Sequence, residues 1–445
     1  MASAVAVATG QAPVIEGARA SGHGRTALVL GANGFIAGFI IAALRTRGWR
    51  VIRGVRRADG GDDTRACDLA DDSSDWRAVL DGVDAVVNAA GILRESGRQC
   101  FEAIHHDAPL ALARACVEAG VRRFVQVSAL GHADDGEFIA SKHRFDEALL
   151  RLPLSAVVLR PSVVYSTRGS YGGTSLLRAM AGLPCVLALP GHGQWPLQPV
   201  AAEDLGELVA QATATEATGV LDVVGPAPLT LADYLRRWRR WLRVGPALTL
   251  QAPESAVSML AWLGERFGAG PLGQTMWKML RRGNVAAPDA HGRLHAAFGI
   301  APRGLDEVLE SEPSQVQDRW HARLYWLGPL LRVAVAALFL LSACAGLVTP
   351  AATIESLAQG SALAAAHPVA MARVASVLDL TLALWLIGGR AARAAVASMI
   401  ALVLVYTVVF GMALPALWLD PLGGLAKNLV MLPALAVLWI LSDRR

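Results

Sequence analysis

The sequence predicts an α/β protein in which a doubly wound parallel Rossmann sheet with a smaller substrate-side lobe is followed by an all-α bundle of four transmembrane helices. Short apolar runs alternate with helix-like segments over the first half of the chain, which is the pattern of a parallel sheet with helical crossovers. A glycine-rich turn follows the first run. The chain is 54% hydrophobic, and this excess over soluble domains lies after Tyr325, where Leu, Ala, Val and Ile dominate.

Five apolar runs are expected to form the sheet, with helices between them. We predict strands at Thr26–Leu30, Arg50–Val55, Ala85–Val87, Arg123–Val127 and Ser155–Leu159, and helices from the glycine-rich turn to about Arg47, over Ala108–Ala119 and over Ser141–Leu150. The expected parts are a disordered tail at residues 1–25, the Rossmann domain at 26–230, the substrate-side lobe and linker at 231–324, and the transmembrane domain at 325–445. The tail lacks the basic segment and apolar core of a signal peptide.

Charge and cysteine content narrow the possible partners. The net charge is +4 without a long Lys/Arg tract, which argues against nucleic acid as the main partner. The five cysteines are scattered and form no CxxC pair. We therefore expect free thiols in a reducing compartment and no metal site.

The glycine-rich turn has the residues that a dinucleotide site needs. Gly31 allows the tight turn, Gly34 lets the backbone approach a pyrophosphate, and Ala37 is small enough for the helix to pack on the strand. The N-terminus of that helix favours the phosphates. The expected cofactor-binding residues of this turn are Gly31, Asn33, Gly34, Phe35 and Ile36.

The end of the second strand indicates which nucleotide is bound. It carries Arg53, Arg56 and Arg57 and no acidic residue. NAD-binding proteins place Asp or Glu near this point to bind the ribose hydroxyls, whereas basic residues accommodate the 2′-phosphate of NADP. The sequence favours NADP(H), bound through Arg53 and Arg56, and leaves NAD(H) open. Solvated loop charge is the alternative interpretation of these arginines.

Further motifs resemble the extended and atypical short-chain dehydrogenase/reductase family. They are Asp68-Leu69, Asn88-Ala-Ala-Gly91, Val127-Ser128-Ala-Leu-Gly131 with Lys142 on the next helix, and Arg160-Pro-Ser-Val-Val-Tyr165. Family members similar to this chain include the NAD(P)H-binding accessory subunit of complex I. The resemblance implies that Asp68 and Leu69 contact adenine, and that Ser128, Lys142 and Tyr165 are candidate catalytic residues. It also implies cofactor contacts by Ala89, Ala90, Gly91, Lys142, Pro161 and Val163.

One position departs from the family pattern. The family's catalytic pair is Tyr-x-x-x-Lys, in which the lysine lowers the tyrosine pKa and the phenol passes a proton as hydride moves. Here the stretch is Phe138-Ile-Ala-Ser-Lys142, and phenylalanine has no exchangeable proton. Lys142 can still hold the nicotinamide ribose. We therefore expect cofactor binding without the usual proton relay.

A basic and Trp-rich stretch from Tyr234 to Arg243 has helical spacing. Two interpretations stay open. It is either a surface helix whose Trp side chains pack on its own domain, or a helix that lies on anionic lipid.

Four apolar runs approach the length of about 20 residues that a bilayer span requires. They are Leu327–Val348, Val374–Gly388, Ala394–Leu414 and Leu425–Leu441. Basic residues precede the first run, separate the second from the third and end the chain, whereas residues 349–370 and 415–424 contain none. The positive-inside rule then predicts a multi-pass protein of a bacterial inner membrane with both termini and the Rossmann domain in the cytoplasm. Asp379 in the second run is expected to face the bundle and find a cationic or polar partner.

The segment Asp420-Pro-Leu-Gly-Gly-Leu-Ala-Lys427-Asn428 opens the fourth run and resembles the DoxX-like membrane family, which has four spans. The joining segments Arg281-Arg-Gly-Asn284 and Val316 to Tyr325 resemble it as well. This resemblance implies an architecture and little about substrate.

Two functions of different classes are expected. The first is an NAD(P)H-dependent oxidoreductase that acts on a lipid-soluble acceptor such as a quinone. The second is a non-catalytic nucleotide-binding protein for assembly or sensing in a membrane complex. Phe138 favours the second, whereas Ser128, Lys142 and Tyr165 keep the first open. The expected partners are the lipid bilayer and either a lipid-soluble substrate or a membrane complex.

Overall fold

The computed structural model describes residues 24–71, 74–267, 273–420 and 424–443. The chain forms two compact units. The first contains Met1–Thr174, Ala188–Trp241 and Thr249–Pro313, and the second contains Ser175–Leu187, Leu242–Leu248 and Ser314–Arg445. Residues 1–23 of the predicted tail, residues 421–423 of the DoxX-like motif, and Arg444 and Arg445 lie outside the described residues. The domain boundaries proposed from the sequence stay a prediction.

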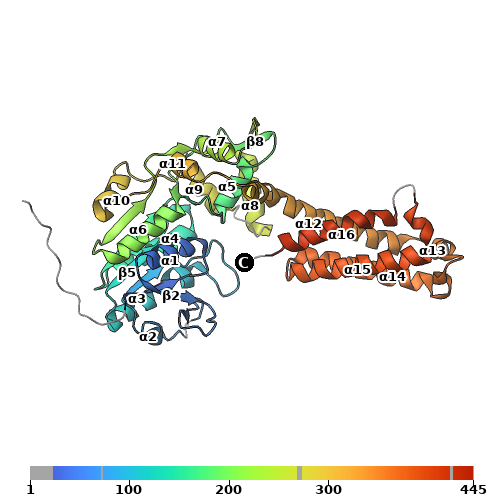
Figure 1. Ribbon diagram of the computed structural model, residues 1–445, viewed down its shortest axis with the longest axis horizontal. Coiled ribbons are helices and arrows are strands. Elements are labelled where there is room, and N and C mark those ends of the chain that lie inside the picture. Colours follow the sequence, from blue (N-terminus) through green and yellow to red (C-terminus); the bar gives the residue numbers. More distant parts are fainter. Residues whose placement is uncertain (1–23, 72–73, 268–272, 421–423, 444–445) are drawn as a thin grey trace, which may run out of the picture. The chain divides into compact units, whose positions relative to one another are not determined.

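A seven-stranded parallel sheet forms the centre of the first unit (Figure 1). Its order is β11-β6-β5-β4-β1-β2-β3. The strands are β1 (Thr26–Leu30), β2 (Arg50–Val55), β3 (Thr64–Ala66), β4 (Ala85–Asn88), β5 (Arg123–Val127), β6 (Ala156–Pro161) and β11 (Gly219–Val223). The five predicted strands are confirmed, and β3 and β11 are additional. The sequence Thr-Arg-Ala of β3 is too short and polar to give an apolar run.

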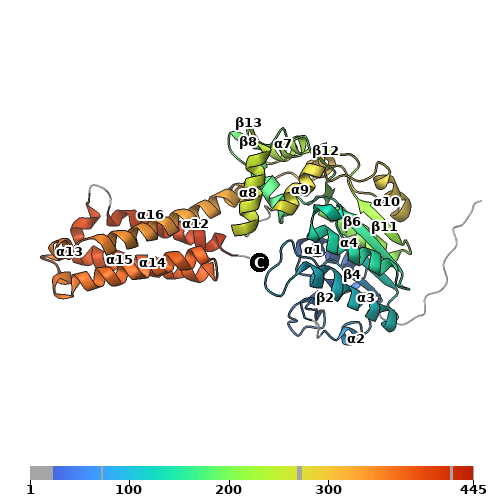
Figure 2. The same cartoon turned by 180° about the vertical axis from the view of Figure 1, so that it is seen from behind.

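Helices cover both faces of this sheet (Figures 1 and 2). They are α1 (Phe35–Thr46) and α6 (Ala202–Ala214) on one face, and α2 (Trp76–Val79), α3 (Ala108–Ala119) and α4 (Glu137–Leu150) on the other. Because both faces are covered, the central strands are apolar at nearly every position. The two resulting cores hold the carboxyl ends of β1 and β4 in fixed positions.

One helix start differs from the prediction. The structure begins α4 at Glu137 and not at Ser141, because Gly136 has a φ of 141° and ends the preceding η2 (Ala133–Asp135). Phe138 and Lys142 therefore lie one turn apart on the same helix. A π-helix, η1 (Ala103–Asp107), precedes α3 without a break.

The remaining elements of the first part of the chain are short. They are β7 (Val164–Tyr165), α5 (Gly173–Ala181), β8 (Val186–Pro190), β9 (Pro196–Leu197), β10 (Val200–Ala201), β12 (Leu229–Thr230), α7 (Leu231–Trp241), β13 (Leu248–Ala252), α8 (Glu254–Phe267), α9 (Gln274–Arg282), α10 (Ala290–Phe298) and α11 (Leu305–Ser311). The basic and Trp-rich stretch forms α7, in which Tyr234, Trp238 and Trp241 are buried and Arg236 and Arg240 are exposed. The packing interpretation of this stretch is confirmed.

The second unit contains long apolar helices (Figure 1). They are α12 (Val316–Val348), α14 (Pro368–Gly388), α15 (Ala392–Ala413) and α16 (Asn428–Leu441), with α13 (Ala351–Ala358), η3 (Ala362–Ala365), η4 (Pro415–Trp418) and η5 (Leu425–Lys427) between them. Among the described residues, three helices are long and apolar enough to cross a membrane: α12, α14 and α15. The helix α16 has 14 residues, fewer than the roughly 20 that a bilayer core requires. A fourth full span stays a prediction.

Asp379 on α14 lies inside this bundle, as expected, with only 4% of its surface exposed. Its carboxylate accepts hydrogen bonds from Ser342 Oγ at 2.6 Å and from Tyr406 Oη at 3.4 Å. These partners come from α12 and α15, so three helices meet at this carboxylate. The partners are polar, whereas Arg373 donates to the backbone oxygens of Gly346 and Thr349.

Candidate functional site

The order of strands in the sheet reverses next to β1. The neighbours of β1 are β2 and β4, so the chain crosses the sheet in opposite directions from this point. In such sheets ligands bind at the carboxyl ends of the strands beside the reversal. The segment after β1 begins with Gly31, and the segment after β4 contains Ala89 and Ala90.

Gly31 is required by the close approach of these two segments. Its φ is +68°, and a Cβ at this position would lie 2.8 Å from the Cα of Ala90. Asn88 fixes the opposite segment, because its side chain accepts a hydrogen bond from the N–H of Ala90 and donates one to Gln126. The backbones of the two turns therefore pack closely against each other in front of α1.

The N-terminus of α1 is open to an anion. Among the described residues, α1 has no side-chain N-cap and no acidic residue in its first turn, which begins at Gly34 and contains Phe35 and Ile36. The first N–H groups of a helix have no partner within the helix. Together with the helix dipole they bind phosphate groups.

Arg53 and Asn33, both predicted to bind the nucleotide, contact each other beside this turn. Arg53 at the end of β2 donates a hydrogen bond to the side chain of Asn33 at 2.8 Å. Arg56 is exposed in the loop that follows β2. Asp68 caps its own turn by accepting from the N–H of Ala70, and Leu69 is buried beneath it.

Lys142 is buried behind the end of β4. A Cβ at Gly91 would lie 3.3 Å from Lys142 Nζ and 3.5 Å from His105 Nε2. The amine donates to the backbone oxygen of Val127 at 3.4 Å and lies 6.0 Å from the centre of the Phe138 ring. Burial lowers the pKa of Lys142 to about 8, with Asp146 opposing that effect. Desolvation favours the neutral amine.

His105 is a site residue that the sequence did not indicate. Its Nε2 accepts from the N–H of Ile92 at 3.0 Å, and its Nδ1 lies 3.0 Å from Ser141 Oγ. Burial, with a contribution from Lys142, lowers the pKa of His105 to about 2. A neutral ring that accepts at Nε2 carries its proton on Nδ1. His105 therefore joins the segment after β4 to α4. Its only sequence signal is a His-His pair before an apolar helix, which is not specific.

Ser128 belongs to a second buried network. Its hydroxyl donates to Asp146 at 2.8 Å, and Arg160 donates to the same carboxylate oxygen at 2.9 Å. Burial raises the pKa of Asp146, and Arg160 opposes that rise. In this arrangement Ser128 holds α4 to the sheet.

The structure places Tyr165 in a separate cluster. Its side chain is 1% exposed, its ring contacts Trp238, and its hydroxyl has no hydrogen-bond partner among the described protein atoms. Pro161 and Val163 fix neighbouring backbone, because their carbonyl oxygens accept from Leu130 and Val200. The hydroxyl of Tyr165, a candidate catalytic residue by family resemblance, is thus enclosed by this cluster, and a catalytic role for it stays a prediction.

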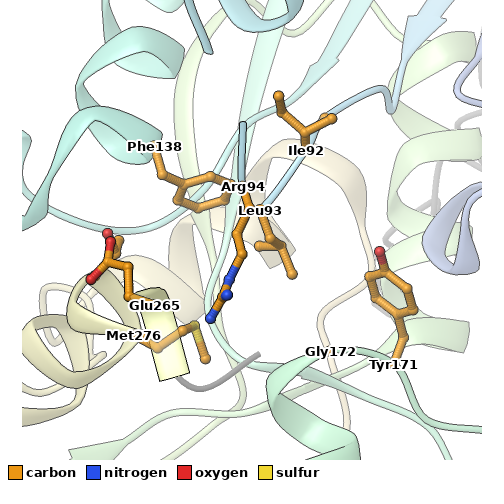
Figure 3. Close-up of a pocket in the computed structure, with 11 residues that line it drawn as sticks. Ile92, Leu93, Arg94, Phe138, Tyr171, Gly172, Glu265 and Met276 are labelled. Atoms are coloured by element: carbon orange, nitrogen blue, oxygen red, sulfur yellow. The ribbon is translucent and has the colours of Figure 1, made fainter. Parts of the chain in front are cut away.

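A pocket of about 350 Å³ adjoins Gly91 (Figure 3). Its described lining is mostly apolar, with Phe138 and Met276 on one side and Tyr171 on the other. The charged residues are Arg94 and Glu265. Apart from Gly91 and Phe138, the sequence did not indicate these residues, because they come from a loop and from α8 and α9 of the irregular lobe.

Tyr171 connects the pocket to the nucleotide turn. Its ring is stacked on that of Phe35, with 6.3 Å between the ring centres and 16° between the planes. Among the described residues that line the pocket, Tyr171 is the one tyrosine. The sequence did not indicate it as a site residue.

Ligand-type side chains gather at one further place in the described part of the chain. Glu102, His106 and Asp107, at and just before the π-helix η1, bring their ligand atoms within 4.8 Å of one another. His106 lies 3.2 Å from Glu102 and 2.8 Å from Asp107, and Glu102 also pairs with Arg144, so both carboxylates have partners within the protein.

These observations define a class of protein. The close backbone packing at Gly31, the open N-terminus of α1 and the buried lysine behind Gly91 fit a dinucleotide-binding site. The class is a reductase-like dinucleotide-binding domain joined to membrane helices.

Comparison with known proteins gives the family. Residues 31–174 match the NAD(P)H-binding family model, and residues 336–439 match the DoxX-like family model. The chain is 30% identical over 270 residues to a 3-diazoavenalumate denitrifying reductase of a Streptomyces species, and this match covers 53% of the chain and 87% of the relative. The chain belongs to the NAD(P)H-binding, short-chain dehydrogenase/reductase-like family and carries a DoxX-like C-terminal domain.

Other relatives match over a smaller part of their length. The chain is 24% identical over 254 residues to NADH dehydrogenase (ubiquinone) 1 alpha subcomplex subunit 9 of Arabidopsis thaliana, which covers 51% of the chain and 62% of that subunit. It is 28% identical over 145 residues to a ceramide reductase of Caulobacter vibrioides, covering 31% of the chain and 45% of the relative.

Solved structures share the fold. The human epimerase family protein SDR39U1 with NADPH has a TM-score of 0.50 at 22% identity, over 64% of this chain and 98% of that one. MoeE5 in complex with UDP-glucose and NAD has a TM-score of 0.50 at 19% identity, over 67% and 99%. These matches fit the doubly wound sheet that the sequence predicts.

Proposed function

We propose that this protein is a membrane-anchored NAD(P)H-dependent oxidoreductase that reduces a lipid-soluble acceptor such as a quinone. The observation that carries the proposal is the largely apolar pocket beside Gly91 and Lys142, on a chain that also has membrane-length helices. The name of the ceramide reductase relative supports a lipid-like substrate. We further propose NADPH as the preferred cofactor, because Arg53 lies beside the nucleotide turn.

The side chains in the pocket suit an acceptor that does not need a proton from the protein. When bound, NADPH supplies a hydride. Phe138 lies where the family has its proton-donating tyrosine and cannot supply the proton. A quinone that receives a hydride needs one further proton, which water can provide. Lys142 would hold the nicotinamide ribose, and Phe138 and Met276 would exclude water from the face of the acceptor.

The second candidate function is a nucleotide-binding, non-catalytic role in a membrane complex. Two observations favour it: Phe138 removes the proton donor, and one relative is a subunit of NADH dehydrogenase. In this case the chain would bind NADPH tightly and oxidise it slowly with every acceptor. The binding site and the membrane helices are the same in both candidates, so turnover separates them.

The test is NADPH oxidation by the full chain in lipid nanodiscs, with a quinone and with a soluble carbonyl compound as acceptors. We expect quinone-dependent oxidation and very slow carbonyl reduction, because a positioned acid is worth about 10²–10⁴-fold. Phe138→Tyr should raise the carbonyl rate and leave the quinone rate within a few-fold. NADPH binding without oxidation by either acceptor would support the second candidate.

Two tyrosine variants test the source of the proton in the same assay. Tyr171→Phe should reduce the carbonyl rate that remains, because Tyr171 lines the pocket. Tyr165→Phe should not, because Tyr165 is enclosed by its own cluster. Strong wild-type carbonyl reduction that is lost in Tyr165→Phe would show that the catalytic acid is Tyr165.

We also propose a bacterial inner membrane with the nucleotide-binding unit in the cytoplasm, as the distribution of basic residues favours. Cys100 is exposed on this unit. A maleimide that does not cross membranes should label Cys100 in broken cells and not in intact spheroplasts. Equal labelling in both would reverse the orientation.

A further inference from the structure

The helix α8 turns an apolar face to the outside of the nucleotide-binding unit. Its inner face contains Val257 and Ala261, which pack against Trp277 of α9. On its outer face, Met259 is 58% exposed and Trp262 54% exposed. A surface helix ordinarily places polar residues on its outer side. The helix α8 is therefore apolar on both sides.

Neighbouring residues extend this face into a patch. The patch consists of exposed large apolar residues on α8 and α9 together with Leu250 on the preceding strand β13. We call it the α8 patch, and its residues are Leu250, Met259, Leu260, Trp262, Leu263 and Met276. A hydrogen bond of 2.8 Å from Trp277 Nε1 to Ser258 Oγ joins α8 to α9.

The charges around the α8 patch are mainly positive. Lys278, Arg281 and Arg282 are exposed on α9, and Arg266 is exposed at the end of α8. The acidic residues exposed on α8 are Glu254 and Glu265. Glu254 pairs with Arg281 at 3.3 Å, and Arg282 pairs with the buried Asp135 at 3.0 Å. Trp, Met and Leu on one surface with Lys and Arg beside them is the composition of helices that lie in the interface of an anionic bilayer. Indole rings in particular favour that interface.

We propose that the α8 patch binds the surface of the phospholipid bilayer that the membrane helices of the same chain cross, with Trp262 and Met259 in the boundary between head groups and acyl chains. The helix α11 of the nucleotide-binding unit ends at Ser311 and α12 begins at Val316, so a short linker ties this unit to the first membrane helix and keeps lipid at a high local concentration near the unit. That proximity favours lipid over a separate protein partner. The basic residues beside the patch contact anionic head groups.

This contact has a consequence for substrate entry, which rests on the proposed function. The helices α8 and α9 also provide Glu265, Thr275 and Met276 to the pocket. A bilayer against the α8 patch therefore lies beside the pocket lining, and an acceptor dissolved in the acyl chains reaches the pocket without crossing water. The lipid contact itself requires no catalysis, so it can be tested separately.

The experiment uses the full chain at one copy per nanodisc, made with anionic lipids whose acyl chains are brominated or unmodified. Bromine quenches Trp fluorescence at short range. The emission of Trp262 is obtained as the difference between wild type and Trp262→Phe. We expect brominated lipid to remove most of that emission. The matched control is Trp76→Phe, because Trp76 is partly exposed on α2, and its difference emission should not change.

A charged variant provides the second readout. Met259→Glu combined with Leu263→Glu should abolish the quenching of Trp262 and increase hydrogen exchange in α8, while NADPH affinity stays unchanged. Equal Trp262 emission in brominated and unmodified lipid would overturn the proposal. Protection of α8 that appears only with two copies per nanodisc would also overturn it, and would assign the patch to a second copy of the chain.

Discussion

Single residues decide how closely two segments of backbone pack, and Gly31 shows this most directly. A side chain there would meet the backbone of Ala90 at 2.8 Å while φ is +68°. Neither strain can be relieved by rotating a side chain, since the obstructing atoms belong to the backbone after β4. The turn is therefore specific to glycine for a steric reason.

We expect Gly31→Ala to abolish measurable NADPH binding and to destabilise the first unit by roughly 1–3 kcal/mol. The matched control is Gly38→Ala, because a Cβ at Gly38 meets nothing within 4 Å and the residue lies inside α1. Calorimetric titration and thermal unfolding of both variants check this. Normal NADPH binding by Gly31→Ala would show that the turn at Gly31 does not hold the pyrophosphate.

The proposed preference for NADPH over NADH rests on Arg53, which lies beside the nucleotide turn. Arg53→Ala should weaken NADPH binding by about 10–100-fold, because a charge-assisted contact to phosphate is worth ~1.5–3 kcal/mol. NADH binding should change little. Arg50→Ala is the control, since Arg50 is exposed at the opposite end of the same strand. Titration with both nucleotides measures this. Wild-type protein that binds NADH as tightly as NADPH would contradict the assignment.

At the scale of elements, α7 and α8 show that composition alone does not tell which helix meets lipid. The helix α7 has the more basic and Trp-rich sequence, yet Trp238 and Trp241 are buried against the domain. The helix α8 has a less distinctive sequence and exposes Trp262. The difference arises because Trp238 packs against Tyr165, which is distant in sequence, whereas α8 packs only its inner face, against Trp277 of α9.

The packing of α7 predicts the effect of removing its central ring. Trp238 is 2% exposed and contacts the rings of Tyr165, Tyr234 and Trp241. Trp238→Ala should lower the stability of the first unit by about 3–5 kcal/mol, and Arg240→Ala on the exposed side should change it by less than about 0.5 kcal/mol. Thermal unfolding measures both. A stable Trp238→Ala protein with reduced lipid contact would instead indicate that α7 meets the bilayer.

At the scale of the whole molecule, a nucleotide-binding unit and a membrane unit share one chain, and each has its own buried polar centre. In the membrane unit the centre is Asp379, which joins α12, α14 and α15 through Ser342 and Tyr406. Polar groups inside a bilayer are costly unless they are paired. The network therefore fixes how these three helices pack.

Asp379→Ala should destabilise the membrane unit by about 1–3 kcal/mol, because it removes the acceptor of the Ser342 hydroxyl and one of the two acceptors of the Tyr406 hydroxyl, which keeps the carbonyl oxygen of Ala375. Asp379→Asn keeps an acceptor and should be milder. Leu384→Ala is the control, as Leu384 is exposed on the same helix. Thermal unfolding in detergent compares the three variants. An Asp379→Ala protein as stable as the control would show that the network does not hold the bundle.

The sequence by itself determined the sheet, the nucleotide turn and the apolar helices, because these depend on local patterns: the alternation of apolar runs, the spacing of Gly31 and Gly34, and the length of uncharged segments. It also located Phe138 four residues before Lys142. Residues close together in the chain specify each of these features, so the sequence alone is enough to predict them.

Only the tertiary structure decided which side chains share a pocket. It brought His105 to Lys142, buried Tyr165 away from the pocket, and placed Tyr171 beside Phe35. It likewise decided that α7 turns its Trp residues inward and that α8 does not. These outcomes depend on how segments that are separated in the sequence pack together. The pattern of residues within one segment therefore could not indicate them.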